Sequence, residues 1–509
     1  MRGNRIIIIL ALVAMVLPGC KKSWLDINTN PNQLPTSTPE YVFTAAANRT
    51  AAILDPNELG SYWSGQWTQS STYIISNTIF AYQFNSTNFN YWDTWYDVLQ
   101  DFQFVIDNAD DKNQKFMKGP ARVMKAYLMQ QVVDVYGNVP YNDALKGTAS
   151  LAPKFDDQKA IYDDLIKVLD TAVTDLKANV FTAAGTSADI MLKGNAANWI
   201  RFANSLKLRI LIRQSRIAGK DAYITAEINK AAATTEGFLT AGLDVTSNPG
   251  YLASDGKTNP FYDRWGYAAN GTIRALARYP RPTVFLFDVL KASNDTFRLK
   301  RLFYAAGGED PNNAGVSTKA EELSNYVPVP FGIASGYLSQ NTSYIGPSQI
   351  VKGQFNRSMV LMTAAESFFL LAEAKQRYGA SVTLPLTAQA YYEQGVKESF
   401  RLTGTAATAA TTLLTSGKDL ADWTASPDKL KAIWMQKWIA LVNYSGLEAW
   451  SEFRRTNFPV TPPSASAPAN QKLPLRLFYP QTESTSNGEN IKSQGTIDVF
   501  NTRIFWDVD

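Results

Sequence analysis

The stretch Ala121-Arg122-Val123-Met124-Lys125-Ala126-Tyr127, followed by Asp134-Val135-Tyr136-Gly137-Asn138-Val139-Pro140-Tyr141, sets the framework of the fold. It belongs to a segment from about Gly119 to Tyr136 in which apolar residues recur every three or four positions, as on one face of a helix. Gly137 just past that segment and Pro140 soon after are typical of a helix end, because proline cannot continue the helix. The sequence therefore predicts a helix that ends near Tyr136 and a change in chain direction.

Amphipathic segments of the same kind recur along the chain and predict four pairs of helices, so the expected fold class is mainly α. The pairs cover about 90–109 with 119–136, 157–179 with 194–215, 359–378 with 386–402, and 429–442 with 447–455. Pairs of this length are the units of tetratricopeptide-type stacking, although ordinary antiparallel helices explain the same periodicity. One more helix is expected from Pro39 to about Leu54, with Thr38 as its cap.

Two irregular regions interrupt the helices. Residues 239–353 are rich in Gly, Pro, Asn and Tyr and hold short β-prone runs such as Tyr326–Pro330, and residues 459–495 precede an expected final strand, Arg503–Trp506. A loop region this long inside a compact protein is usually functional or forms a second lobe. We therefore expect one domain over residues 39–509, in which the helix pairs support an irregular lobe of about 239–353 and 459–509.

The first 19 residues predict an export signal: Arg2 and Arg5 precede an apolar run from Ile6 to Leu17. Twelve residues rise about 18 Å as a helix, too little to cross a hydrocarbon core of about 30 Å. Leu17-Pro18-Gly19-Cys20 resembles a bacterial lipobox, and Cys20 is the only cysteine, so an internal disulfide cannot explain it. We expect lipidation (palmitate or similar acyl chains) at Cys20 and a polar tether over 20–38; the alternative is a plain secretory signal beside an incidental cysteine.

Composition excludes several classes of function. Loss of two arginines with the signal leaves 47 basic residues against 45 acidic ones, whereas a nucleic-acid binder shows a basic face. The chain has no histidine, which removes Ser-His-Asp and Cys-His catalysis and nearly all zinc sites. Catalysis by paired carboxylates remains open.

Several segments together resemble the SusD/RagB family of outer-membrane nutrient-binding lipoproteins. They are the two runs quoted first, Gly194-Asn195 through Trp199 with Phe202–Arg209, Ala364–Glu366 with Leu371–Ala374, Gln436–Trp438, and Glu448–Trp450 with Arg454–Thr456. The resemblance implies a SusD-like fold of four tetratricopeptide-like helix pairs with an irregular lobe. It also implies a surface-exposed lipoprotein of the cell outer membrane that binds a glycan, or a peptide in the RagB-type branch. Its implied partner is a SusC-like TonB-dependent β-barrel transporter.

Two aromatic-rich windows are the candidate ligand sites. Residues 61–96 hold twelve aromatic and eighteen Ser, Thr, Asn or Gln residues, with Asp93 as the only charge, and residues 259–267 hold four aromatics beside Arg264. Aromatic rings suit the apolar faces of sugars, and amides and hydroxyls suit their rims. The windows predict glycan contacts by Trp63, Trp67, Tyr73, Tyr82, Tyr262, Arg264, Trp265 and Tyr267, on two sides of a groove. The alternative is burial, in the protein or against the transporter; Trp92, Trp95 and Tyr96 are expected inside the first helix pair.

Other charged residues have structural explanations. Asp156 and Asp157 lie at a helix start, where acidic residues cap free amides, so the acidic clusters do not favour a carboxylate-based glycoside hydrolase. Lys207, Arg209 and Arg213 are expected to point outward, and Arg454 and Arg455 to brace a helix end. We predict a binding protein rather than an enzyme, without catalytic residues, metal or cofactor; a pure protein-clamping scaffold is a third hypothesis.

Overall fold

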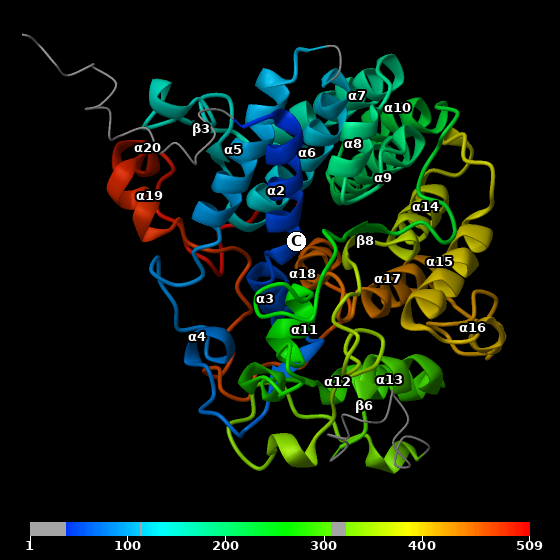
Figure 1. Ribbon diagram of the computed structural model, residues 1–509. Coiled ribbons are helices and arrows are strands. Elements are labelled where there is room, and N and C mark those ends of the chain that lie inside the picture. The colour runs from blue at the N-terminus through cyan, green and yellow to red at the C-terminus, as the bar shows by residue number, and fades with distance from the viewer. Residues whose placement is uncertain (1–36, 112–113, 307–321, 509) are drawn as a thin grey trace, which may run out of the picture.

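The computed structural model describes residues 37–111, 114–306 and 322–508. The predicted signal peptide, Cys20 and most of the tether lie outside these residues. Figure 1 shows helices in the upper half and on the right, with a loop-rich part below them. Within the described ranges, no helix is both long and apolar enough to cross a membrane.

All eight helices of the predicted pairs form. They are α5 (Trp92–Asn108) and α6 (Lys118–Tyr136), α7 (Gln158–Ala178) and α9 (Ala196–Arg213), α14 (Ala364–Tyr378) and α15 (Ala388–Thr403), and α17 (Lys429–Ala440) and α18 (Gly446–Thr456). Helix α6 packs between α5 and α7, α7 packs in turn against α9, and α14 packs against α9, α15 and α17. The mainly α fold class is confirmed, whereas tetratricopeptide-type stacking stays a prediction.

Local sequence explains where these helices begin and end. Gly137 follows α6 with φ of 78°, a conformation that glycine adopts without strain. The Asp157 carboxylate caps α7 by accepting hydrogen bonds from the backbone N–H groups of Lys159 (2.9 Å) and Ala160 (3.1 Å), as expected for an acidic residue at a helix start. Helix α2 (Pro39–Ala52) also forms as predicted, but the Thr38 side chain makes no capping hydrogen bond.

Shorter elements complete the fold, and most of them were not predicted. The helices are α3 (Asp55–Trp63), α4 (Asn77–Phe80), α8 (Ala183–Ala188), α10 (Asp221–Ala232), α11 (Pro260–Trp265), α12 (Val284–Ala292), α13 (Thr296–Leu302), α16 (Ala407–Leu414), α19 (Gln481–Ser486) and α20 (Gly488–Lys492). The strands form antiparallel pairs: β1 (Trp67–Gln69) with β5 (Pro280–Pro282), β2 (Val139–Pro140) with β3 (Phe155–Asp156), β4 (Val245–Ser247) with β8 (Met359–Met362), and β6 (Phe303–Tyr304) with β7 (Tyr344–Ile345).

Two predicted elements are wrong. Met359–Met362 was expected to form the first turn of a helix, but it forms strand β8, because it pairs with β4. Helix α14 begins only after it, where the Thr363 hydroxyl accepts a hydrogen bond from Glu366 N–H. Arg503–Trp506 is not a strand: the segment has no partner strand, and the Trp506 indole N–H instead donates to the buried Asp134 carboxylate at 2.9 Å. In both cases tertiary pairing, which the local sequence does not encode, decided the outcome.

The prediction that Lys207, Arg209 and Arg213 point outward is wrong. All three side chains are 3% exposed or less. Helices α14 and α18 cover the face of α9 that carries the two arginines. Lys207 is covered by a carboxylate of α7 and a carboxylate of α10, which both accept hydrogen bonds from it. Arg209 pairs with Glu366 at 2.6 Å. Arg213 pairs with Glu452 at 2.5 Å and also with Glu448.

Arg455, in the last turn of α18, extends the same buried network by pairing with Glu373 at 2.8 Å and Glu452 at 2.6 Å. Lys437 of α17 joins it through Glu448 at 3.1 Å. A buried charge is costly unless it is paired, so these pairs fix the relative positions of α9, α14, α17 and α18.

Candidate functional site

A surface groove of about 400 Å³ lies beside the first turns of α3. It is lined by Asp55, Glu58, Leu59, Ile79, Phe89, Asn90, Tyr91 and Arg264, and we call it the α3 groove. A neighbouring depression of about 250 Å³ shares Asp55, Asn90 and Tyr91 with it and adds Arg49 and Thr94. Binding sites for small ligands usually measure about 300–1,000 Å³, so the α3 groove is large enough for a short segment of a glycan or peptide.

Arg264 is held in the groove by two carboxylates of α3. Its Nη1 lies 2.6 Å from Asp55 and its Nη2 lies 2.5 Å from Glu58, while the guanidinium covers the Trp265 ring at 5.2 Å. The short helix α11 presents Arg264 there, because Pro260 starts the helix and the Asn259 side chain caps it at Tyr262 N–H. The arrangement presents a fixed charge cluster at the wall of the groove.

Burial and pairing have opposite effects on this cluster. Burial raises the pKa of Glu58 above its usual value, although the charge and hydrogen bond of Arg264 act in the opposite direction. Burial also disfavours the Arg264 cation, but the carboxylates of Glu58 and Asp55 outweigh burial and raise the pKa of Arg264. Arg264 therefore stays charged, and its charge is already matched inside the protein.

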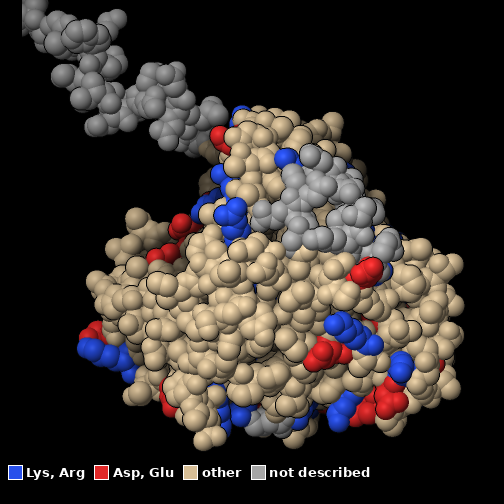
Figure 2. Space-filling model, turned by 90° about the horizontal axis from the view of Figure 1, so that it is seen from below, with Lys and Arg blue, Asp and Glu red and all other residues tan. Residues whose placement is uncertain are grey.

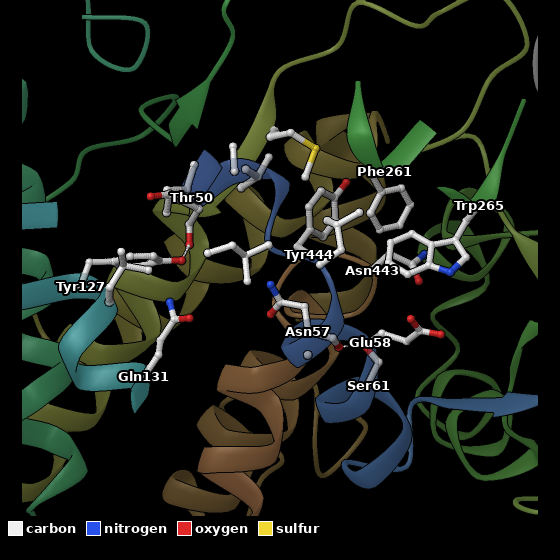
Figure 3. A pocket seen from close by; sticks show the side chains of 18 of the residues that line it. Thr50, Asn57, Glu58, Ser61, Tyr127, Gln131, Phe261, Trp265, Asn443 and Tyr444 are labelled. Carbon is white, nitrogen blue, oxygen red and sulfur yellow. Dashed lines mark hydrogen bonds between the residues drawn. The ribbon is translucent and has the colours of Figure 1, made fainter. Parts of the chain in front are cut away.

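An aromatic layer lies beneath the groove. The Trp265 ring packs edge-on against Trp67 at 5.5 Å and against Phe261 at 4.6 Å. These rings border an internal cavity of about 40 Å³, which Figure 3 shows with Asn57, Tyr127, Gln131 and Tyr444 around it. A water molecule needs about 10–15 Å³ of such space, so the cavity accommodates a few waters and not a sugar ring.

The eight predicted ligand residues fall into two groups. Arg264 lines the α3 groove and Tyr73 is partly exposed, whereas the other six are at most 7% exposed: Trp63, Trp67, Tyr82, Tyr262, Trp265 and Tyr267. Trp63 packs on Trp450 at 5.1 Å, and the Trp67 indole N–H donates to Asn443 at 2.8 Å. None of these six side chains lines the α3 groove, and their burial leaves no exposed face for a ligand.

The two predicted windows nevertheless meet in space. Phe89, Asn90 and Tyr91 come from the first window, and Arg264 comes from the second. Asp55 and Glu58 were missed, because Asp55-Pro56-Asn57-Glu58 precedes the aromatic window and is typical of a helix start. Trp92 and Trp95 are buried in the first helix pair, as predicted, and the Tyr96 hydroxyl donates to Pro140 O at 2.6 Å.

Tyr73 is partly exposed but does not line the α3 groove. Its ring lies 4.9 Å from that of Tyr279 with 30° between the planes, and its hydroxyl donates to Ala275 O. The segments 59–92 and 323–351 contain no charged residue, and they are joined where Ser71 N–H donates to Tyr337 O at 2.9 Å. Figure 2 shows the lower face with a broad area of uncharged residues and most charged residues near its edge.

The arrangement carries no sign of a metal centre. Over residues 37–111, 114–306 and 322–508, no group of three or more His, Cys, Asp or Glu side chains could hold a metal ion. Asp157 caps α7 as predicted. The same prediction is wrong for Asp156, because its carboxylate instead accepts hydrogen bonds from the backbone N–H groups of Tyr141 and Asn142, at 2.9 Å each, in the turn after β2.

The fold is mainly helical and carries a preformed surface groove of aromatic, amide and charged side chains, a combination typical of a ligand site. The family model for SusD-like proteins, described as starch-binding and associating with the outer membrane, matches residues 31–480, and the chain belongs to this family. No relative among curated proteins matches the chain.

Solved structures of SusD homologues share the fold. A chitin-binding SusD homologue from Flavobacterium johnsoniae is 24% identical with a TM-score of 0.74, over 92% of this chain and 99% of that one. A SusD homologue from Bacteroides fragilis is 20% identical with a TM-score of 0.75, over 92% of this chain and all of that one. A third, from Bacteroides uniformis, is 23% identical with a TM-score of 0.72 over 92% and 100% of the two chains.

Proposed function

We propose that the protein binds oligosaccharide or polysaccharide at the cell surface and delivers it to a SusC-like TonB-dependent outer-membrane transporter. The observation that carries the proposal is the α3 groove, in which the partly exposed ring of Phe89 lies beside an amide (Asn90) and a fixed ion pair (Arg264 with Asp55 and Glu58). Sugar rings present apolar C–H faces and a rim of hydroxyls, and this wall offers partners for both.

The family relationship supports the same function. The family description names starch binding and outer-membrane association, and the Flavobacterium johnsoniae structure is named as chitin-binding. We infer that Cys20 carries the lipid anchor and that residues 20–38 tether the domain to the membrane. Several acyl chains anchor a protein stably, whereas one chain binds only reversibly.

The structure changes which residues we propose as ligand contacts. Arg264 and Tyr73 remain from the sequence-based set, and Asp55, Phe89 and Asn90 join them because they line the groove and are not buried. Tyr91 also lines the groove, but it is only 8% exposed and is proposed as support. Trp63 and Trp265 are proposed as support for the groove, since both are buried. Truncation of a buried tryptophan to alanine costs about 3–5 kcal/mol, so those substitutions test stability rather than ligand contact.

Isothermal titration of a soluble chain that starts after Cys20, against a panel of neutral glycans and peptides, tests the function. Phe89→Ala should weaken glycan binding about 2- to 13-fold, because an aromatic contact contributes about 0.5–1.5 kcal/mol. The matched control is Phe104→Ala. Phe104 lies on α5 outside the groove and is partly buried, as Phe89 is, so this variant should bind as the wild type does.

Other outcomes separate the alternatives. Heat of binding with peptides and none with glycans would favour the RagB-type cargo. Release of new reducing ends from a polysaccharide, lost on Asp→Asn substitution, would show a hydrolase instead. Equal loss of affinity in Phe89→Ala and Phe104→Ala would remove the groove from the proposal while leaving glycan binding itself in place.

A further inference from the structure

The charged groups around the α3 groove are not balanced. The groove and its neighbouring depression are lined by two carboxylates, Asp55 and Glu58, and two cations, Arg49 and Arg264, so the lining alone has no net charge. Arg49 is in turn bound by two carboxylates of α5, Asp101 at 2.8 Å and Asp97 at 3.4 Å. When these two partners of Arg49 are counted with the lining residues, the site has four carboxylates and two cations, a net charge of about −2.

Both arginines are already engaged. Arg264 directs one terminal nitrogen at each of Asp55 and Glu58, and its Nε is buried. Arg49 uses its two terminal nitrogens on Asp101 and Asp97. Each guanidinium is therefore neutralised by two carboxylates, so an acidic ligand group that approaches Arg264 or Arg49 also meets the negative charges of those carboxylates.

The carboxylate that faces the groove most openly is Asp55. Its side chain is 58% exposed, against 18% for Glu58 and 31% for Arg264. A further carboxylate, Asp93, lies next to the groove residue Asn90, whose amide nitrogen donates to it at 2.7 Å. A ligand in the groove therefore meets the exposed negative charge of Asp55, whereas the positive charge of Arg264 is already paired with carboxylates.

We propose that the α3 groove selects glycans by charge: it admits neutral and amino-bearing sugars and excludes sugars that carry carboxylate or sulfate groups. The proposal rests on the proposed glycan-binding function and narrows its substrate class. An ammonium group on a sugar pairs with Asp55, a neutral hydroxyl bonds to it, and a carboxylate on the ligand is repelled by it.

The test uses one glycan in two charge states. The tightest neutral glycan from the panel is compared with the same glycan after oxidation of its primary hydroxyls to carboxylates, by titration at low salt. Like charges about 4 Å apart in water repel by an amount that corresponds to about a fivefold change in affinity. We expect the oxidised glycan to bind at least fivefold more weakly to the wild type, and 0.5 M NaCl to reduce the difference because salt screens exposed charges.

Substitution of Asp55 separates charge from the lost hydroxyls. Asp55→Asn removes the exposed carboxylate and one of the two charged partners of Arg264, but it keeps an oxygen that can accept a hydrogen bond. The preference for the neutral glycan over the oxidised glycan, measured as the ratio of the two affinities, should therefore fall about fivefold or more. Glu393→Gln, on α15 outside the groove, removes a carboxylate elsewhere and should change neither.

Two results would overturn the inference in different ways. Equal affinity of the wild type for the neutral and oxidised glycans, or an unchanged ratio of the two affinities in Asp55→Asn, removes charge selection and leaves glycan binding standing. Absence of binding by every glycan, neutral, amino-bearing or acidic, removes the proposed function together with the selection.

Discussion

The closest backbone crossing near the site is that of α3 and α18, and Gly60→Ala tests whether it positions the α3 groove. A Cβ at Gly60 would lie 2.4 Å from the carbonyl carbon and oxygen of Gly446 and 2.5 Å from Leu447 N, where ordinary contacts begin at 3.4 Å. The atoms in the way are all backbone, so α3 or α18 has to move by about 1 Å.

The expected cost follows from two opposing effects. Overpacking costs about 1–3 kcal/mol, and a backbone obstacle places this case at the upper end. Alanine gains about 1 kcal/mol over glycine inside a helix, which leaves a net loss of about 2 kcal/mol. Unfolding entropy of about 2.1 cal/mol/K per residue amounts to about 1 kcal/mol/K here, so the Tm should fall by about 2 °C.

Differential scanning fluorimetry measures this shift, and titration measures the second consequence. Asp55 and Glu58 lie on the first turn of α3, so a displaced α3 should also weaken glycan binding. Gly488→Ala is the control, because a Cβ there meets nothing within 4 Å and α20 lies outside the groove. A Gly60→Ala protein with an unchanged or higher Tm would refute the reasoning.

Three further outcomes are expected. Arg209→Met leaves the Glu366 carboxylate buried without its partner and should lower the free energy of unfolding by about 3–5 kcal/mol. The double variant Arg209→Met with Glu366→Gln should recover most of this loss in thermal unfolding, and no recovery would contradict the pairing. Burial raises the pKa of Asp134 above the ordinary value of 3.8. The protonated carboxyl therefore contributes to the stability of the folded state below pH 3.8, and this contribution is lost as the pH rises through the raised pKa. The Tm of Asp134→Asn relative to wild type should therefore rise between pH 4 and pH 7, and a constant difference would argue against it. Cys20→Ser should abolish acylation in intact-mass spectra and release the protein from membranes; a wild-type thiol without lipid would remove the anchor.

Much of the helical framework was predictable because local patterns encode it. Helices α5, α6 and α7 each keep an apolar stripe at the helical period and carry recognisable ends at Gly137 and Asp157. Where two distant segments decide the structure, prediction failed: β8 pairs with β4 across more than a hundred residues, and no local feature of Met359–Met362 distinguishes that strand from a helix start.

The site was predicted in outline and not in detail. Both aromatic windows do border the groove, but the composition of a window does not reveal which rings are exposed. Trp63 and Trp265 became core because large aromatic side chains gain most by burial, whereas Phe89 and Asn90 remained at the surface. Asp55 and Glu58 belong to the site only because α3 faces α11, some 200 residues later in the chain.

The sequence by itself determined the mainly helical class, the positions of the paired helices, the absence of histidine chemistry and the family. Those properties depend on periodicity and composition, which are local. Tertiary structure alone decided that Arg209 and Arg213 of α9 are buried in ion pairs, that Arg264 pairs with Asp55 and Glu58, and that six of the eight candidate side chains are buried. The physical reason is that burial and charge pairing depend on which distant segment of the chain packs over a residue, and the local sequence around that residue does not specify this segment.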